Sequence, residues 1–151
     1  MTWGTTPRES IQAVCRARGV DGVISDCIRL IEGGEVDPGL IIALAGPGQE
    51  RFLDKSEKER YWLRVWAVRG LLWALSEERT DERIEAAVIN ALGDTHWRVR
   101  EMAAKLAARH RLDSAQPALA GLLTDDNERV RAAAARAVRI LQASESPESS
   151  S

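Results

Sequence analysis

The chain reads Asp94-Thr95-His96-Trp97-Arg98-Val99-Arg100, and 31 residues later it reads Asp125-Asp126-Asn127-Glu128-Arg129-Val130-Arg131. The match continues beyond these two heptapeptides, because Ala103-Ala104 aligns with Ala134-Ala135. Self-similarity at a period of about 20–50 residues is typical of stacked helical repeats. Such a repeat is a helical hairpin that buries its second face only by stacking on its neighbours. The repeated heptapeptide therefore predicts an array of paired helices that binds other molecules along an extended surface.

Helix signals recur along the rest of the chain, and strand signals are almost absent. Capping boxes are predicted at Thr6-Pro7-Arg8-Glu9 and at Ser56 to Glu59, and Gly46-Pro47-Gly48 is a strong helix breaker. Apolar periodicity predicts eight helices, over residues 6–18, 21–32, 37–45, 56–75, 81–92, 96–110, 114–123 and 127–142. Because the connections are short, the predicted fold is all-α, a short α-solenoid of about four antiparallel helix pairs.

The length of 151 residues predicts one helical-repeat domain over residues 1–143. Residues 144–151 have no apolar side chain, so we expect a disordered tail there. The repeats are clearest over residues 80–142. Residues 1–50 fit only as helical hairpins, which predicts either divergent repeats or a cap for the array.

Composition is that of an ordinary soluble protein, with 44% apolar and 29% charged residues. The net charge of −2 gives no overall reason to expect nucleic acid, although residues 94–143 carry nine Arg and Lys against six Asp and Glu. Cys15 and Cys27 each lie among apolar residues and are expected in the core. No secretory signal and no membrane-spanning run is visible, so we expect a cytoplasmic protein without disulfides.

The heptapeptides resemble HEAT repeats, particularly the short repeats of bacterial proteins related to phycobilisome lyases. That family has an Asp at the turn between paired helices and a Val-Arg pair whose Arg follows six residues later, as in both copies here. Pro117 matches a proline common in the family. The resemblance implies a structural ladder of hydrogen bonds between successive repeats, formed by Asp94, Arg100, Asp125 and Arg131.

Small actinobacterial HEAT-repeat proteins resemble the chain at two further places. These are Arg60-Tyr61-Trp62-Leu63-Arg64-Val65-Trp66 and Trp97-Arg98-Val99-Arg100-Glu101-Met102. Two alignments of the first place with the repeat are open, Arg64-Val65 with Arg98-Val99 or Leu63-Arg64 with Val99-Arg100. Neither alignment recovers the Asp of the turn.

The predicted helix over residues 56–75 carries Trp62, Trp66, Arg69 and Trp73 as one stripe, at i, i+4, i+7 and i+11. We favour burial of the indoles between neighbouring helix pairs, with Arg69 stacked on their faces. The alternative is a groove in which Trp62, Trp66 and Arg69 bind a partner, because aromatic and Arg side chains are typical binding anchors.

A second candidate surface follows the repeat itself. Arg98 and Lys105 are seven residues apart and share a helix face, and the repeat places Arg129 and Arg136 beside them. Pairing of Glu101 with Lys105 and of Asp125 with Arg129 would make this an ordinary solvated face. The sharper hypothesis is a positive surface for an acidic peptide or a phosphate backbone, formed by Trp97, Arg98, Lys105, Arg129 and Arg136.

No pattern in the chain predicts catalysis, a metal site or a cofactor. His96 and His110 are the only histidines, and both are expected as surface or capping residues. The favoured function is a non-enzymatic scaffold that binds a protein partner. The alternatives are a HEAT-like DNA-binding protein or alkylpurine DNA glycosylase, and third a phycobilisome-lyase-like or chaperone-like subunit. A membrane is not expected as a partner.

Overall fold

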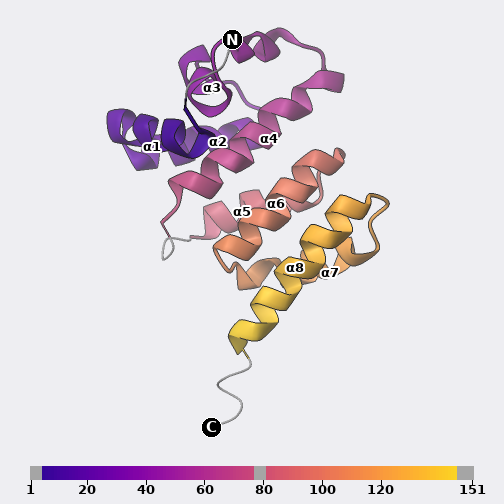
Figure 1. The fold of residues 1–151 in the computed structure, drawn as a ribbon. Helices are drawn as coiled ribbons and strands as arrows, with labels where there is room; N and C mark the ends of the chain where they lie inside the picture. Colours follow the sequence, from indigo (N-terminus) through magenta and orange to yellow (C-terminus); the bar gives the residue numbers. More distant parts are fainter. Residues whose placement is uncertain (1–4, 77–80, 146–151) are drawn as a thin grey trace. The chain divides into compact units, whose positions relative to one another are not determined.

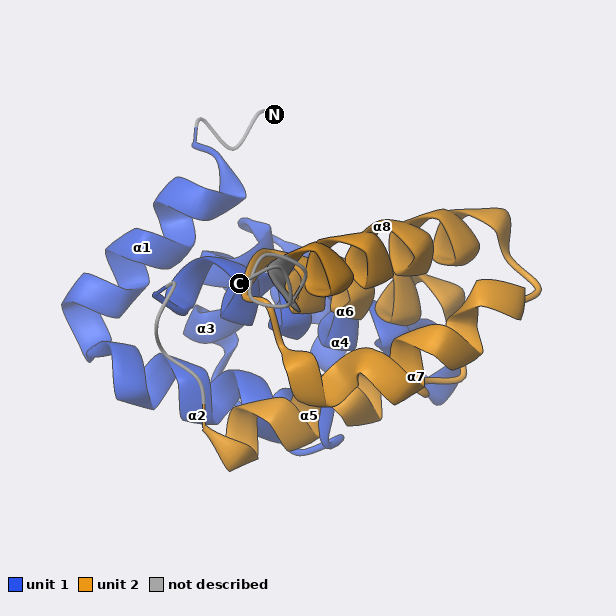
Figure 2. Cartoon of the chain, turned by 90° about the horizontal axis from the view of Figure 1, so that it is seen from below, with its two compact units in different colours: residues 1–76 blue, residues 77–151 orange. Residues whose placement is uncertain are grey.

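The computed structural model describes residues 5–76 and 81–145, in which all regular elements are helical. Eight α-helices, α1 to α8, and three short 3-10 helices, η1 to η3, follow one another along this part of the chain (Figure 1). They form two compact units, residues 1–76 and 77–151 (Figure 2). The predicted all-α fold is confirmed. The prediction of a single domain over residues 1–143 stays a prediction, and each unit is described by itself.

Unit 1 contains α1 (Pro7–Arg18), α2 (Val20–Ile31), α3 (Pro38–Ala45), η1 (Gln49–Asp54) and α4 (Glu57–Ala74). The first helices of the two pairs, α1 and α3, contact each other, and so do the second helices, α2 and α4. This produces the two helical layers of an α-solenoid. Gly19 is the only residue between α1 and α2, and its φ of 90° is one that glycine adopts without strain.

The helix starts in unit 1 follow the sequence signals in one case and depart from them in another. The capping box of Thr6 is confirmed, because Thr6 Oγ1 accepts from Glu9 N (3.1 Å) and Glu9 Oε1 accepts from Thr6 N (3.0 Å). The capping box predicted at Ser56 is wrong, since the Ser56 side chain accepts no hydrogen bond from the helix. Helix α4 begins directly after η1, and Arg60 secures that junction by donating from Nη1 to Leu53 O (2.8 Å).

Close helix packing in unit 1 depends on a glycine in α4. A Cβ atom on Gly70 would lie 2.7 Å from Leu44 Cδ2 and 2.8 Å from Cys27 Sγ, so a side chain there would push α4 away from α2 and α3. Cys15 and Cys27 are both buried, as predicted, and burial raises the pKa of each thiol. Neither cysteine is therefore suited to act as a thiolate nucleophile.

The tryptophan stripe of α4 turns partly into the core. Trp66 is 7% exposed and meets the ring of Phe52 edge to face, with ring centres 5.2 Å apart. Trp62 stacks on Trp66 at 6.1 Å and keeps more of its surface exposed. Large aromatic side chains dominate the energetics of small cores, so Trp66 is a main anchor of α4 in unit 1.

Unit 2 contains α5 (Glu82–Leu92), α6 (Trp97–Arg109), η2 (Asp113–Ala115), α7 (Gln116–Gly121), η3 (Leu122–Thr124) and α8 (Glu128–Glu145). Helix α6 packs along α8, and α5 contacts α7, which again gives two layers (Figure 2). The single helix predicted over residues 114–123 is in fact a short α-helix between two 3-10 turns. Helix α8 continues to Glu145, past the predicted start of the tail, and residues 146–151 lie outside the described part.

Small buried residues allow α6 and α8 to pack closely. Three pairs of equivalent positions are fully buried: Val99 and Val130, Ala103 and Ala134, and Leu106 and Ala137. In α4 the buried residues Leu63, Ala67, Val68 and Leu71 have the same spacing as Val99, Ala103, Ala104 and Ala107. Burial therefore supports the alignment of Leu63-Arg64 with Val99-Arg100. In that alignment Lys58, already inside α4, takes the place of Asp94.

Replacing Trp66 by Ala is expected to lower the free energy of unfolding by about 3–5 kcal/mol, because it leaves a cavity beside Phe52. The measurement is urea denaturation followed by circular dichroism. Trp62→Ala is the matched control and should cost clearly less, since Trp62 is more exposed. An unchanged midpoint for Trp66→Ala would contradict its place in the core.

Candidate functional site

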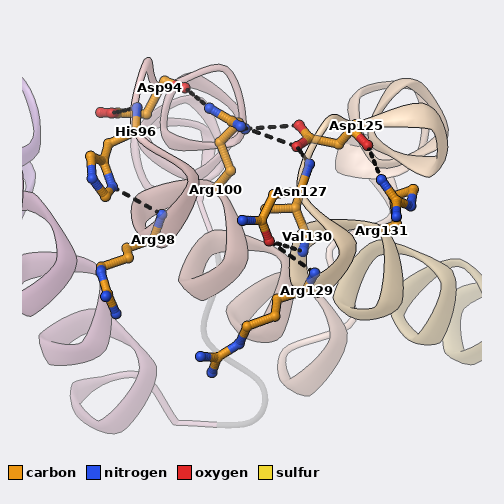
Figure 3. Close-up of polar contacts among 9 residues, drawn as sticks. All are labelled: Asp94, His96, Arg98, Arg100, Asp125, Asn127, Arg129, Val130 and Arg131. Atoms are coloured by element: carbon orange, nitrogen blue, oxygen red, sulfur yellow. Dashed lines mark hydrogen bonds and ion pairs between the residues drawn. The ribbon is translucent and has the colours of Figure 1, made fainter.

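The two heptapeptides build nearly identical turns at the starts of α6 and α8 (Figure 3). Asp94 Oδ1 accepts a hydrogen bond from His96 N (2.8 Å), and Asp125 Oδ1 accepts one from Asn127 N (2.9 Å). A carboxylate that accepts from the backbone two residues further on stabilises a tight turn. Each Asp therefore shapes the turn of its own repeat.

His96 and Asn127 play the same role although they differ in chemistry. His96 Nδ1 accepts from Arg98 N (3.1 Å), and Asn127 Oδ1 accepts from Arg129 N (2.9 Å) and Val130 N (3.3 Å). The expected capping role of His96 is thus confirmed, and it requires an unprotonated Nδ1. His110 follows the last residue of α6, also at a cap position, but it is buried and not a surface residue.

Arg100 links the two turns. Its Nε donates to Asp125 Oδ2 (2.9 Å) and its Nη2 to Asp125 Oδ1 (3.1 Å), while Nη1 donates to Asp94 O (2.9 Å) (Figure 3). A guanidinium that bonds both oxygens of one carboxylate is strong and geometrically selective. Arg131 stands in the equivalent position of the next repeat and donates from Nη1 to Asp125 O (2.6 Å). These contacts form a ladder row that runs from Asp94 to Arg131.

The ladder pair is shielded from water, with exposed side-chain fractions of 17% for Arg100 and 9% for Asp125. Burial alone would raise the pKa of Asp125. The hydrogen bonds from Arg100 and from Asn127 N, together with the charges of Arg100 and Arg131, more than offset burial and lower that pKa. Asp125 is therefore ionised at neutral pH, which keeps the Arg100 contact charge-assisted.

The other side of the same helices carries Trp97 with two guanidinium groups close to its ring. Arg98 Cζ lies 4.5 Å from the centre of the Trp97 ring, and Arg129 Cζ, from α8, lies 5.5 Å from it. The His96 ring stacks near Trp97 with centres 6.0 Å apart. Cations over an indole face are attracted by its quadrupole, so this arrangement holds a partly exposed aromatic ring in place.

Glu101 is a carboxylate on the same side of α6 and α8 as Trp97, and it pairs with two cations there. Its Oε2 accepts from Arg129 Nε (3.1 Å) and lies 3.6 Å from Lys105 Nζ, so the predicted pairing with Lys105 is present. The predicted pairing of Asp125 with Arg129 is wrong. Asp125 is occupied by Arg100, and Arg129 reaches instead to Glu101 of the preceding repeat. Arg136 is exposed and makes no ion pair within residues 5–76 and 81–145.

In unit 1 the stripe does not form the stack that the sequence predicts. Arg69 donates from Nη2 to Leu44 O (2.8 Å) near the C-terminus of α3, where a positive charge is favourable. Burial lowers the pKa of Arg69. The guanidinium over Trp73 is that of Arg8, 5.2 Å from the ring centre. Stacking of Arg69 on the indoles is therefore wrong, and Arg69 instead satisfies an end of a helix.

Comparison with known protein families identifies the repeats. Residues 50–139, more than half of the chain, match the family described as HEAT repeats. The chain belongs to the HEAT-repeat family. The match begins upstream of the repeats that are clearest in sequence and takes in most of η1 and all of α4. No curated protein and no solved structure matches the chain. The closer resemblance to bacterial repeats related to phycobilisome lyases stays a prediction.

HEAT repeats commonly mediate protein–protein interactions, and the family is generally non-enzymatic. In the described residues of this HEAT-repeat protein, no group of three or more His, Cys, Asp or Glu side chains is placed to hold a metal ion. None of the helices in that part has the length and apolar character needed to cross a membrane.

Arg100→Ala should destabilise unit 2 by about 3 kcal/mol, because it leaves the shielded Asp125 carboxylate without its main partner. Arg100→Lys should recover only part of this loss, since an ammonium group cannot bond both oxygens in the same plane. Urea denaturation measures both. The matched control is Arg131→Ala, which removes one exposed hydrogen bond and should cost about 1 kcal/mol or less. Equal losses at positions 100 and 131 would argue against the ladder.

His96→Ala should cost about 1 kcal/mol, because the N–H of Arg98 loses its acceptor. His96→Asn should retain most of the stability, since Asn127 performs this role in the next repeat. Thermal unfolding of the two variants beside the wild type is the measurement. If Asn destabilises as much as Ala, the Nδ1 contact contributes little.

Proposed function

We propose that this HEAT-repeat protein is a non-enzymatic scaffold that binds a protein partner through one side of α6 and α8. We call this surface, which is formed by five side chains, the α6/α8 face. Its residues are Trp97, Arg98, Lys105, Arg129 and Arg136. The observation that carries the proposal is the partly exposed indole of Trp97, with the guanidinium groups of Arg98 and Arg129 close to its ring.

The chemistry of this face is that of a binding surface. Trp and Arg are the residues most often found to dominate the binding energy of protein interfaces. Here they stand on two long helices and not on loops, so no backbone segment of the face has to become ordered when a partner binds. Arg98 and Arg129 extend away from the ladder row (Figure 3). A partner on the α6/α8 face therefore need not disturb the contacts of Arg100 with Asp125.

The residues of the tryptophan stripe are expected to contribute less to partner binding than those of the α6/α8 face. Trp66 is anchored in the core and Arg69 is engaged with Leu44 O, whereas Trp62 is only half-buried. No feature of the described residues favours the DNA-binding, glycosylase or lyase-like alternatives specifically. These alternatives, like the cytoplasmic location, stay predictions.

The proposal is tested by affinity purification from the source organism with three baits: the wild type, Trp97→Ala and Leu123→Ala. Leu123 is an exposed apolar residue outside the α6/α8 face and serves as the control. A partner should be captured by the wild type and Leu123→Ala and be lost with Trp97→Ala. Calorimetry with the purified partner should then show at least about a tenfold weaker affinity for Trp97→Ala. A partner bound equally by all three baits would refute this face as the binding surface.

A further inference from the structure

We infer that the partner of the α6/α8 face presents an acidic segment in which carboxylates accompany an apolar side chain. The inference rests on the proposed function and adds the chemistry of the ligand. Three features of unit 2 carry it: the segregation of charge, the behaviour of Glu101 and the spacing of the cations.

Basic residues of unit 2 are concentrated on one layer of helices. Helix α6 and residues 128–143 of α8 together carry eight Arg and Lys and only two acidic residues, Glu101 and Glu128. Helix α5, in the other layer, carries two Glu and one Arg, and α7 carries no charged residue. Opposite charge on a partner would be drawn to the α6 and α8 layer and would find no such attraction at α5 and α7.

Glu101 indicates which anion suits the surface. This one carboxylate is contacted by both Arg129 and Lys105, so these two cations share a single negative charge and keep an excess of one. The Glu101 side chain is 13% exposed, whereas those of Arg129 and Lys105 are 58% and 46% exposed. The cations therefore lie above their internal carboxylate with donors still turned to solvent. A partner carboxylate can bind them from above without displacing Glu101.

The cations are spaced for a short peptide. Arg98 and Lys105, like Arg129 and Arg136, are seven residues apart, which is about 10 Å along a helix. In a segment of polyproline II conformation, two side chains three residues apart lie on the same side of the backbone, about 9 Å from each other. Trp97 lies at the Arg98 and Arg129 end, where its indole offers an apolar contact. A segment with Glu or Asp at every third position and one apolar residue matches this order.

The same features favour an acidic protein segment over nucleic acid. Residues 77–143 contain eleven Arg and Lys and eleven Asp and Glu, so unit 2 exerts little long-range attraction on a polyanion. Nucleic-acid binding relies on many phosphate contacts made together. Here Arg100 and Arg131 are engaged in the ladder, so few cations of unit 2 are left to make such contacts together.

The test uses a fluorescein-labelled peptide of about twelve residues with Glu at every third position, Ser between them and one central Phe. Fluorescence anisotropy measures its binding to the full chain. Arg129→Glu/Arg136→Glu is the test variant. Arg83→Glu/Arg111→Glu is the matched control, since it makes the same change of net charge at two exposed arginines outside the face.

We expect the peptide to bind the wild type and the control variant, and the test variant to bind at least about tenfold more weakly. A peptide with Gln in place of Glu should not bind, and one with Ala in place of Phe should bind more weakly. Arg136→Glu alone should also weaken binding. Because Arg136 makes no ion pair within the described residues, this variant does not depend on the contact with Glu101. Circular dichroism verifies that each variant is folded.

Equal weakening by the test and control variants would overturn the inference, because binding would then reflect net charge and not this face. Tighter binding of a DNA duplex than of the peptide would also overturn it. The proposed function fails separately, if no partner captured from the organism depends on Trp97. If a captured partner depends on Trp97 but the acidic peptide does not bind, the proposed scaffold function stands and the inference of an acidic segment is overturned.

Discussion

The contact between Arg100 and Asp125 is the interaction on which the arrangement of unit 2 depends. One planar guanidinium bonds both oxygens of a carboxylate in the next repeat and a backbone carbonyl in its own. Apolar burial brings α6 and α8 together but is indifferent to small shifts along their length. The bidentate contact between Arg100 and Asp125, in contrast, is broken when one helix shifts by one residue along the other. The ladder therefore fixes the register of the two repeats, and the small buried residues fill the space between them.

The same heptapeptide serves both structure and surface because of helix geometry. Arg98 and Arg100 are two residues apart, so they project from α6 about 200° from each other. One guanidinium enters the ladder and the other lies over Trp97. The turn residues His96 and Asn127 hold the helix starts, so exchanging one for the other changes little. The heptapeptide thus supplies the turn, the helix cap, the ladder contact and the exposed face. The residue that makes the ladder contact is not the one that forms the face.

Sequence reasoning recovered the helices and the ladder positions because both are encoded locally. Period, capping residues and the six-residue spacing from Asp94 to Arg100 need no knowledge of tertiary structure. It failed where a side chain chooses among partners in different elements. Arg129 has Asp125 four residues before it but bonds Glu101 from another helix, and Arg69 lies in the tryptophan stripe but bonds Leu44 O. Ser56 carries a capping sequence, yet Arg60 secures the junction instead. Periodicity tells which face a residue occupies, whereas the nearest acceptor on that face depends on how the helices pack.

The ladder also gives the array a direction. The interlock between the two repeats has a donor side, Arg100, and an acceptor side, Asp125, and Arg131 takes the donor position again in α8. Two surfaces that both present guanidinium groups, or both carboxylates, would repel. Copies of this repeat can therefore be joined only head to tail, in steps of 31 residues, and an array built from them grows with a single polarity.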